Sequence, residues 1–84
     1  SLLISGALPA DAMADRLGIE IADDREFATA AGYVLSVLKH MPREGEHFRD
    51  QGWRFEVVDM DGLKIDKLLV SADPPRNGED SAPR

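Results

Sequence analysis

Residues 53–70 hold the pattern that most constrains how this chain folds. Apolar and charged side chains alternate over residues 53–57, as in a strand with one buried and one solvated face. Asp61-Gly62 separates this run from a second apolar run, and an Asp-Gly pair at such a place is a strong hairpin signal because a type I′ turn demands positive φ angles. We therefore predict an antiparallel hairpin that turns at Asp61-Gly62 and returns along residues 63–70.

The alternation slips once in each arm of this hairpin. Val57-Val58 and Leu68-Leu69 are adjacent apolar pairs, and a strict two-residue period would place the members of each pair on opposite faces. Either β-bulges occur at these points, or both faces of the sheet are partly covered. We favour the second alternative, with helices on one face and a second copy of the chain on the other.

A strand and a short helix are predicted before the hairpin. Leu2 to Ser5 is apolar and ends at Gly6, and Pro9 suits the first turn of a helix because its missing N–H would have no partner there. Residues 19–26 are expected to run over the surface as a connection, since charged residues interrupt them. The helix between these segments ends at Gly18, and its apolar stripe consists of Ala10, Met13, Ala14 and Leu17.

A second helix with a wider apolar face is predicted over residues 29–39. Thr29 provides a hydroxyl as N-cap. Gly32 indicates that another part of the chain approaches closely, because glycine costs about 1 kcal/mol relative to alanine inside a helix. Pro42 stops the helix. The predicted apolar face consists of Ala31, Val34, Leu35, Leu38 and Met41, with Val37 beside it.

The remaining segments complete an α+β domain. Residues 42–45 indicate a turn, residues 46–50 a weak polar strand, and Gln51-Gly52 a second turn. The predicted order is strand, two helices, then a three-stranded antiparallel meander, with the helices packed on one face of the sheet. The 84 residues suffice for one domain, assigned to residues 1–72. The polar, proline-containing stretch 73–84 is predicted to be a disordered tail.

Composition restricts the classes of function. The chain has no cysteine, so it holds no disulfide, no thiolate metal site and no cysteine nucleophile. Its net charge of −6 argues against nucleic-acid binding, which needs clustered Lys and Arg. No apolar run approaches the roughly 18 residues of a membrane span, so we expect no direct membrane insertion by this chain. A core this small benefits from a partner surface, and we expect a homodimer.

Three groups of polar residues are candidate metal sites, and each has a simpler interpretation. Imidazoles with carboxylates are able to hold zinc or nickel, but the spacing of the first group matches no metal motif and favours a solvated turn. The second group resembles the start of a calcium loop, yet strands flank it and ligands are missing, which favours a hairpin turn. The third would attract Mg²⁺ weakly, and a surface loop is favoured. The groups are His40, Glu44, Glu46 and His47; Asp59-Met60-Asp61-Gly62; and Asp23, Asp24 and Glu26.

No catalytic or metal-binding residue is predicted, and cofactor-binding residues stay unassigned. Ser5 and Ser36 lack the context of a nucleophile elbow, and no glycine-rich phosphate cradle occurs, so we expect no enzyme. Trp53 has two interpretations of equal weight, an interface anchor or a core residue, because it opens a strand beside Gly52.

Several short signatures in this order resemble those of the CorC/HlyC transporter-associated domain. They are Thr29-Ala30-Ala31-Gly32, then Pro42-Arg43-Glu44-Gly45-Glu46, then Phe55-Glu56-Val57-Val58-Asp59-Met60-Asp61-Gly62 with Ile65. With the helix end at Leu17-Gly18, the resemblance covers residues 2–71. Two departures concern Ser5, where family members often carry an acidic residue, and residues 39–41, where a glycine-containing stretch is common.

The resemblance implies a place in a larger membrane protein. Family members have an N-terminal transmembrane region, a pair of CBS nucleotide-sensing modules, and this domain at the C-terminus on the cytoplasmic side. The implied role is a non-catalytic accessory or regulatory domain of a hemolysin-like transport protein of the magnesium and cobalt efflux type, with the CBS and transmembrane regions as partners. No cofactor is expected. Two alternatives stay open: an FAD or adenine-nucleotide module, because the fold is similar to a domain of FAD-binding proteins, and divalent-cation sensing through the acidic loops.

Overall fold

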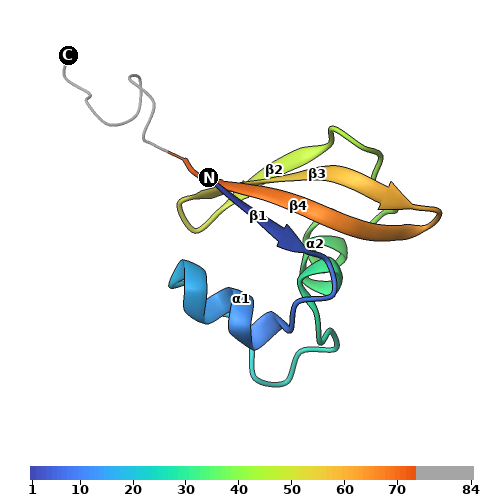
Figure 1. Ribbon diagram of the computed structural model, residues 1–84. Coiled ribbons are helices and arrows are strands. Elements are labelled where there is room, and N and C mark those ends of the chain that lie inside the picture. Colours follow the sequence, from blue (N-terminus) through green and yellow to red (C-terminus); the bar gives the residue numbers. More distant parts are fainter. Residues whose placement is uncertain (74–84) are drawn as a thin grey trace, which may run out of the picture.

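The computed structural model describes residues 1–73 and confirms the α+β class. Figure 1 shows both helices below one face of a twisted four-stranded sheet. The strands are ordered β1-β4-β3-β2, and every neighbouring pair is antiparallel, so the N-terminal strand lies beside the last one. The elements are β1 (Leu2–Ser5), α1 (Ala10–Leu17), α2 (Ala30–Leu38), β2 (His47–Asp50), β3 (Trp53–Asp61) and β4 (Lys64–Ala72).

The core lies between the helices and the inner face of the sheet. Its fully buried side chains come from α1, α2 and the two long strands, so no single element buries its apolar face alone. These side chains are Met13, Val34, Phe55, Val57, Leu68 and Val70. Residues 74–84 lie outside the described part of the chain, and with them most of the predicted tail. Asp73 is described, and its N–H donates to the Gly52 carbonyl at 2.9 Å.

The first helix has the predicted end and buried stripe, but it begins at Ala10, so Pro9 precedes its first turn. Ala10, Met13, Ala14 and Leu17 are all buried. Gly18 ends the helix in a left-handed conformation with φ of 70°, and its N–H donates to the Ala14 carbonyl at 2.8 Å.

The segment after α1 differs from its predicted course. Ile19 is only 8% exposed and belongs to the core, so the expectation of a wholly superficial connection is wrong at this residue. The physical reason is the left-handed turn at Gly18, after which the Ile19 N–H donates to the Ala14 carbonyl at 3.1 Å and so holds Ile19 against the end of α1. Asp23, Asp24 and Glu26 are exposed as expected.

The second helix has the predicted cap but a different buried face. The Thr29 hydroxyl accepts a hydrogen bond from the Gly32 N–H at 3.1 Å, and a Cβ on Gly32 would lie 2.7 Å from the Phe27 Cβ, which confirms the close approach. The buried residues are Ala30, Tyr33 and Val34, whereas Ala31, Leu35 and Leu38 are half-buried. Met41 is 44% exposed, and Val37 39%. Met41 leaves the helical phase because Lys39 already has a φ of 62°.

The two turns of the meander have different geometries. Gln51 and Gly52 both have positive φ, which is the type I′ pattern, and this turn is confirmed. In the second hairpin Asp61 pairs with Lys64, so the loop is Gly62-Leu63 and not Asp61-Gly62. Positive φ occurs there at Gly62 alone, as in a type II′ turn. The predicted I′ turn is therefore shifted by one residue, because a single glycine at the first loop position satisfies the geometry.

Register shifts account for the slip of the apolar alternation at Val57-Val58. The β3–β4 pairing shifts between Val57 and Asp59 and again between Asp59 and Met60. Bulges therefore bring Val57, Leu68 and Ile65 onto the same buried side. Leu68 and Leu69 keep a regular pairing with Ile4 and Leu3 and so point to opposite faces, and covering of the outer face, the alternative favoured from the sequence, stays a prediction there.

Replacing Gly6 by alanine tests the tightest backbone contact of the fold. A Cβ at this position would lie 2.1 Å from the carbonyl oxygen of Ile65, and a backbone atom has little freedom to move away. We expect Gly6→Ala to lower the free energy of unfolding by about 3 kcal/mol, measured by urea denaturation. Gly18→Asn is the matched control, because asparagine tolerates a left-handed φ and its Cβ would meet nothing within 4 Å. Equal loss in both variants would contradict the prediction.

Candidate functional site

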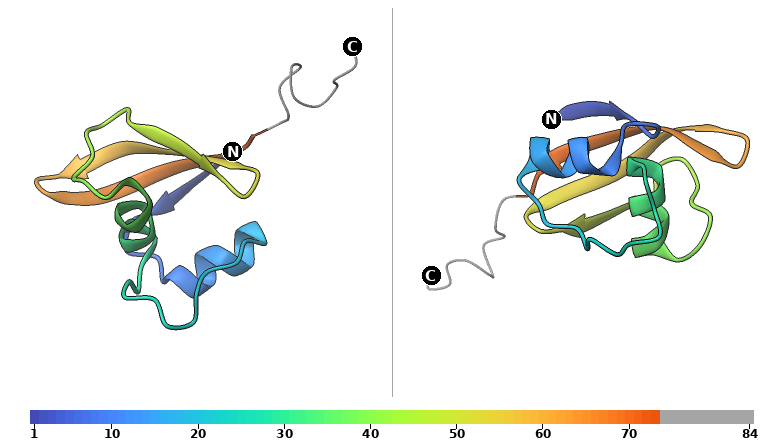
Figure 2. Two further views of the ribbon diagram at one scale, coloured as in Figure 1. Left: turned by 180° about the vertical axis from the view of Figure 1, so that it is seen from behind. Right: turned by 90° about the horizontal axis from the view of Figure 1, so that it is seen from below.

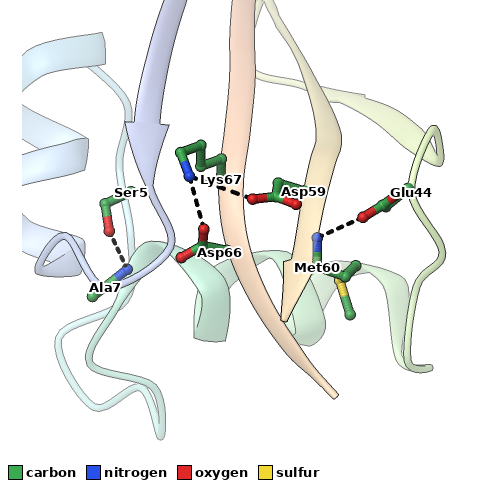
Figure 3. A network of polar contacts seen from close by, with 7 residues as sticks. All are labelled: Ser5, Ala7, Glu44, Asp59, Met60, Asp66 and Lys67. Carbon is green, nitrogen blue, oxygen red and sulfur yellow. Dashed lines mark hydrogen bonds and ion pairs between the residues drawn. The ribbon is translucent and has the colours of Figure 1, made fainter. Parts of the chain in front are cut away.

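The side chains of the first candidate metal site, at His40, Glu44, Glu46 and His47, do not meet at one point. His40 contacts the Glu46 carboxylate through Nε2, and this hydrogen bond lowers the pKa of Glu46. Glu44 instead accepts a bond from the Met60 backbone N–H at 3.0 Å (Figure 3). His47 lies exposed on β2. Among residues 1–73, no three metal-ligating side chains converge.

The two acidic candidates do not converge either. Asp61 is exposed at the end of β3, and Asp59 contacts Lys67. In the loop after α1, Arg25 turns back to the Asp11 carboxylate at 2.7 Å and lies 5.7 Å from the centroid of the Phe27 ring. The loop is therefore held by its basic residue, and its acidic residues remain in solvent.

The register of three strands shows which side chains point to the outer face, which is the face of the sheet opposite the helices. Ile4, Leu68 and Val57 pair across β1, β4 and β3 and are all buried. Because side chains alternate, the neighbouring row of Leu3, Leu69 and Glu56 points to the outer face.

Ion pairs cover much of this outer face. Lys67 donates to Asp66 at 2.8 Å and to Asp59 at 3.3 Å (Figure 3). Its hydrogen bond to Asp66 lowers the pKa of that carboxyl, and the two carboxylates raise the pKa of Lys67. Arg54 donates to Glu56 at 2.8 Å on the neighbouring strand. The two cations and three carboxylates leave a net charge of −1 on this part of the outer face, and their contacts with one another make it polar.

A hollow of about 260 Å³ lies beside β1 on the same side of the molecule. This volume is below the range of about 300–1,000 Å³ that is usual for small-molecule sites. Its lining consists of Leu3, Ile4, Ser5, Asp66 and Lys67. The hollow is therefore smaller than a usual small-molecule site, and flavin binding stays a prediction.

The hydroxyl groups considered for catalysis are bonded to the backbone. Ser5 Oγ accepts a bond from the Ala7 N–H at 3.0 Å (Figure 3), and Ser36 donates to the Tyr33 carbonyl at 2.6 Å. Neither contact includes a histidine or a carboxylate, which an activated serine would need.

Sequence reasoning missed a group of side chains at the β2–β3 turn that we call the turn clamp: Asp50, Gln51 and Trp53. Gln51 exchanges two hydrogen bonds with the Glu20 backbone, at 2.9 Å from the N–H and 3.0 Å to the carbonyl. The Trp53 indole N–H donates to the Leu17 carbonyl at 3.0 Å. Trp53 is half-buried and packs against the core, so the structure favours its core interpretation.

The third contact of the turn clamp joins Asp50 to Tyr33. Tyr33 is 4% exposed, and its hydroxyl donates to the Asp50 carboxylate. Burial, followed by the bond and charge of Asp50, raises the pKa of Tyr33 above its ordinary value. The ring lies 5.4 Å from that of Phe55 and 6.2 Å from that of Phe48, measured between centroids. The helical spacing of Ala30, Tyr33 and Val34 indicates that these residues share one face of α2. The sequence contains no signal for Asp50, on a distant turn, as the acceptor of the Tyr33 hydroxyl.

The family model of the CorC_HlyC transporter associated domain matches residues 1–74. The chain belongs to this family. The resemblance inferred from the short signatures is thereby confirmed. Neither helix of the domain, within residues 1–73, has the length and apolar composition to cross a membrane.

Curated relatives are much longer than this domain. A UPF0053 protein of Synechocystis is 39% identical over 77 residues, which cover 88% of this chain and 17% of that protein. A polyamine export protein of Escherichia coli K12 is 35% identical over 72 residues, which cover 84% of this chain and 16% of that protein. The chain therefore spans about a sixth of the length of these relatives.

Solved structures of similar domains share the fold. The transporter-associated domain of a Xylella fastidiosa hemolysin, in complex with Mg²⁺ and Mn²⁺, is 41% identical, with a TM-score of 0.74 over 83% of this chain and 84% of that one. A conserved domain from Neisseria meningitidis is 33% identical, with a TM-score of 0.79 over 88% of this chain and 99% of that one. The transporter-associated domain thus has the same arrangement of helices on a four-stranded antiparallel sheet.

The Tyr33–Asp50 contact predicts a stability loss at high pH. The fold holds the phenol proton more tightly than the unfolded chain does, so this stabilisation is complete below the ordinary pKa of 10.0 and decreases as the pH rises above it. Tyr33→Phe should lower the free energy of unfolding by about 1–2 kcal/mol at pH 7 and flatten this decline. Urea denaturation from pH 7 to 11 measures both effects, and an unchanged slope in the variant would contradict the assignment.

Proposed function

We propose that the chain is a non-catalytic accessory domain of a membrane transport protein with cationic cargo, and that it acts by self-association and by contacts with neighbouring domains of its parent. The observation that carries the proposal is the family match over residues 1–74 together with relatives named polyamine export protein. Magnesium and cobalt, the cargo implied by the sequence resemblance, share with polyamines a multiple positive charge. Transmembrane and CBS regions of the parent, on the cytoplasmic side, are the partners in this proposal.

The described side chains support a role in contact over a role in turnover. Lys67, Arg54 and Arg25 are each neutralised by a neighbouring carboxylate. The hydroxyl of the buried Tyr33 is bonded within the domain. A domain with this distribution provides shape and exposed backbone to a partner, while its unpaired carboxylates in the loop after α1 lie in solvent.

Removal of the domain from the full-length parent tests the accessory role. We expect deletion of residues 1–73 to change the rate of cation export by about fivefold or more without abolishing it, because an accessory domain biases the transporting region and does not form it. Export of labelled putrescine, Mg²⁺ and Co²⁺ from cells is the measurement, with membrane levels of the protein checked by immunoblot. Gly18→Asn in the parent is the matched control and should leave export unchanged. Complete loss of export at normal membrane levels, or no change, would contradict the proposal.

Divalent-cation binding is a second candidate function, favoured by one observation. The Xylella fastidiosa domain, at 41% identity, was solved in complex with Mg²⁺ and Mn²⁺. Titration calorimetry of the 84-residue chain with Mg²⁺, Mn²⁺ and Co²⁺ tests it. This candidate requires saturable heat at low millimolar concentration, and its absence would remove cation sensing and leave the accessory role intact. Flavin or adenine-nucleotide binding, implied by fold resemblance alone, requires a thermal shift with FAD or AMP.

A further inference from the structure

The two edges of the sheet differ in how they are protected against pairing with another strand. Within residues 1–73, β1 and β2 are the edge strands. β2 reads His47-Phe48-Arg49-Asp50, and charges of this kind discourage edge-to-edge contact. β1 reads Leu2-Leu3-Ile4-Ser5, with no charge, no proline and no register shift against β4. The β1 edge is as short as β2, but it lacks the charges, the proline and the bulge that otherwise block the addition of a strand.

The hydrogen-bond phase of β1 shows which backbone groups face outward. The Gly6 N–H donates to the Asp66 carbonyl at 2.8 Å, and Gly6 follows directly on the pair Ser5–Lys67. Antiparallel ladders alternate between bonded and non-bonded pairs, so Ile4 exchanges bonds with Leu68. Leu3, one residue away, is in a non-bonded pair, and its N–H and C=O point away from β4 to the open edge.

The side chain of Leu3 marks the same position on the outer face. It is 61% exposed, although it lies in the middle of a strand. Leu69 lies beside it on β4 and is half-buried. The ion pairs of Lys67 and Arg54 lie elsewhere on the outer face. An exposed apolar side chain and outward-facing backbone groups therefore occur together at Leu3.

We propose that a second copy of the chain adds its β1 antiparallel to this β1, with the two-fold axis at Leu3. In that register each Leu3 exchanges both backbone hydrogen bonds with the other, Leu2 pairs with Ile4, and the sheet continues through both copies. The edge is self-complementary because its free groups are centred on one residue and because β1 has no charge to repel its copy. This inference rests on the proposed self-association and names the surface that carries it. Figure 2 shows β1 at the rim of the sheet, away from β2, where such an addition extends the sheet.

The test compares two substitutions of exposed leucines in the 84-residue chain by sedimentation equilibrium. Leu3→Lys places two ammonium groups opposite each other across the axis, and we expect the dimer dissociation constant to rise at least about tenfold. Leu63→Lys is the matched control, since Leu63 is 80% exposed at the tip of the β3–β4 hairpin and far from the edge in sequence and register. It should associate as the unchanged chain does. Circular dichroism checks that both variants are folded.

Amide hydrogen exchange of the unchanged chain tests the same surface without a substitution that could disturb the fold. We expect exchange of the Leu3 amide to slow as protein concentration rises, in proportion to the fraction of paired chains. The Arg49 amide is the internal control: the Val57 N–H donates to Glu46, so Arg49 has the outward phase on β2 and should keep a constant rate.

The outcomes separate the surface from the function on which it rests. The β1 surface is contradicted if Leu3→Lys leaves the dimer intact, or if the exchange rate of the Leu3 amide is independent of concentration in a chain that dimerises. Either result leaves self-association itself intact. A chain that stays monomeric at millimolar concentration overturns both the β1 surface and self-association, whereas the accessory role is judged separately by cation export. A dimer lost only with Leu3→Lys, with Leu3 protection, supports the inference.

Discussion

The packing of the β3–β4 hairpin onto the two helices is the interaction on which the rest of the fold depends. Phe55 and Val57 on one strand and Leu68 and Val70 on the other are almost completely buried on the inner face. Burial of such side chains contributes about 1.5–3 kcal/mol each, and a bare hairpin would leave them in water. α1 covers them with a stripe half composed of alanine, which permits close approach, while α2 contributes Val34. The bulges in the hairpin are part of the same solution, since they return the apolar residues to one side.

Side-chain bonds to backbone complete what the apolar core leaves open. The turn clamp ties the β2–β3 turn to the end of α1, to the loop after it and to Tyr33 of α2. A domain of 84 residues has little core, so contacts between distant segments of this kind contribute much of its rigidity. They also use the polar groups of the inner side internally. What remains for a partner is the outside of the sheet with its edges and the solvent-facing side of the helices, where Val37 is 39% exposed.

The distribution of charge divides these outer surfaces into protected and unprotected parts. The outer face has its own ion pairs, and β2 has charged side chains along its edge. β1 has neither an ion pair nor a charged side chain. An accessory domain that works through contact needs one such surface, and the proposed β1 pairing uses the only edge in residues 1–73 that consists of uncharged residues.

Local patterns in the sequence determined the element order, the cap at Thr29, the helix end at Gly18 and the family, because each depends on residues close together in the chain. The candidate metal clusters were also visible as sequence groups, but whether their members meet depends on strand register and loop direction, which only the tertiary structure decided. It separated Glu44 from His40, buried Tyr33 against Asp50, and moved the second hairpin turn to Gly62-Leu63. A side chain's partner across the fold is set by the packing of distant segments, and sequence spacing carries no record of that distance.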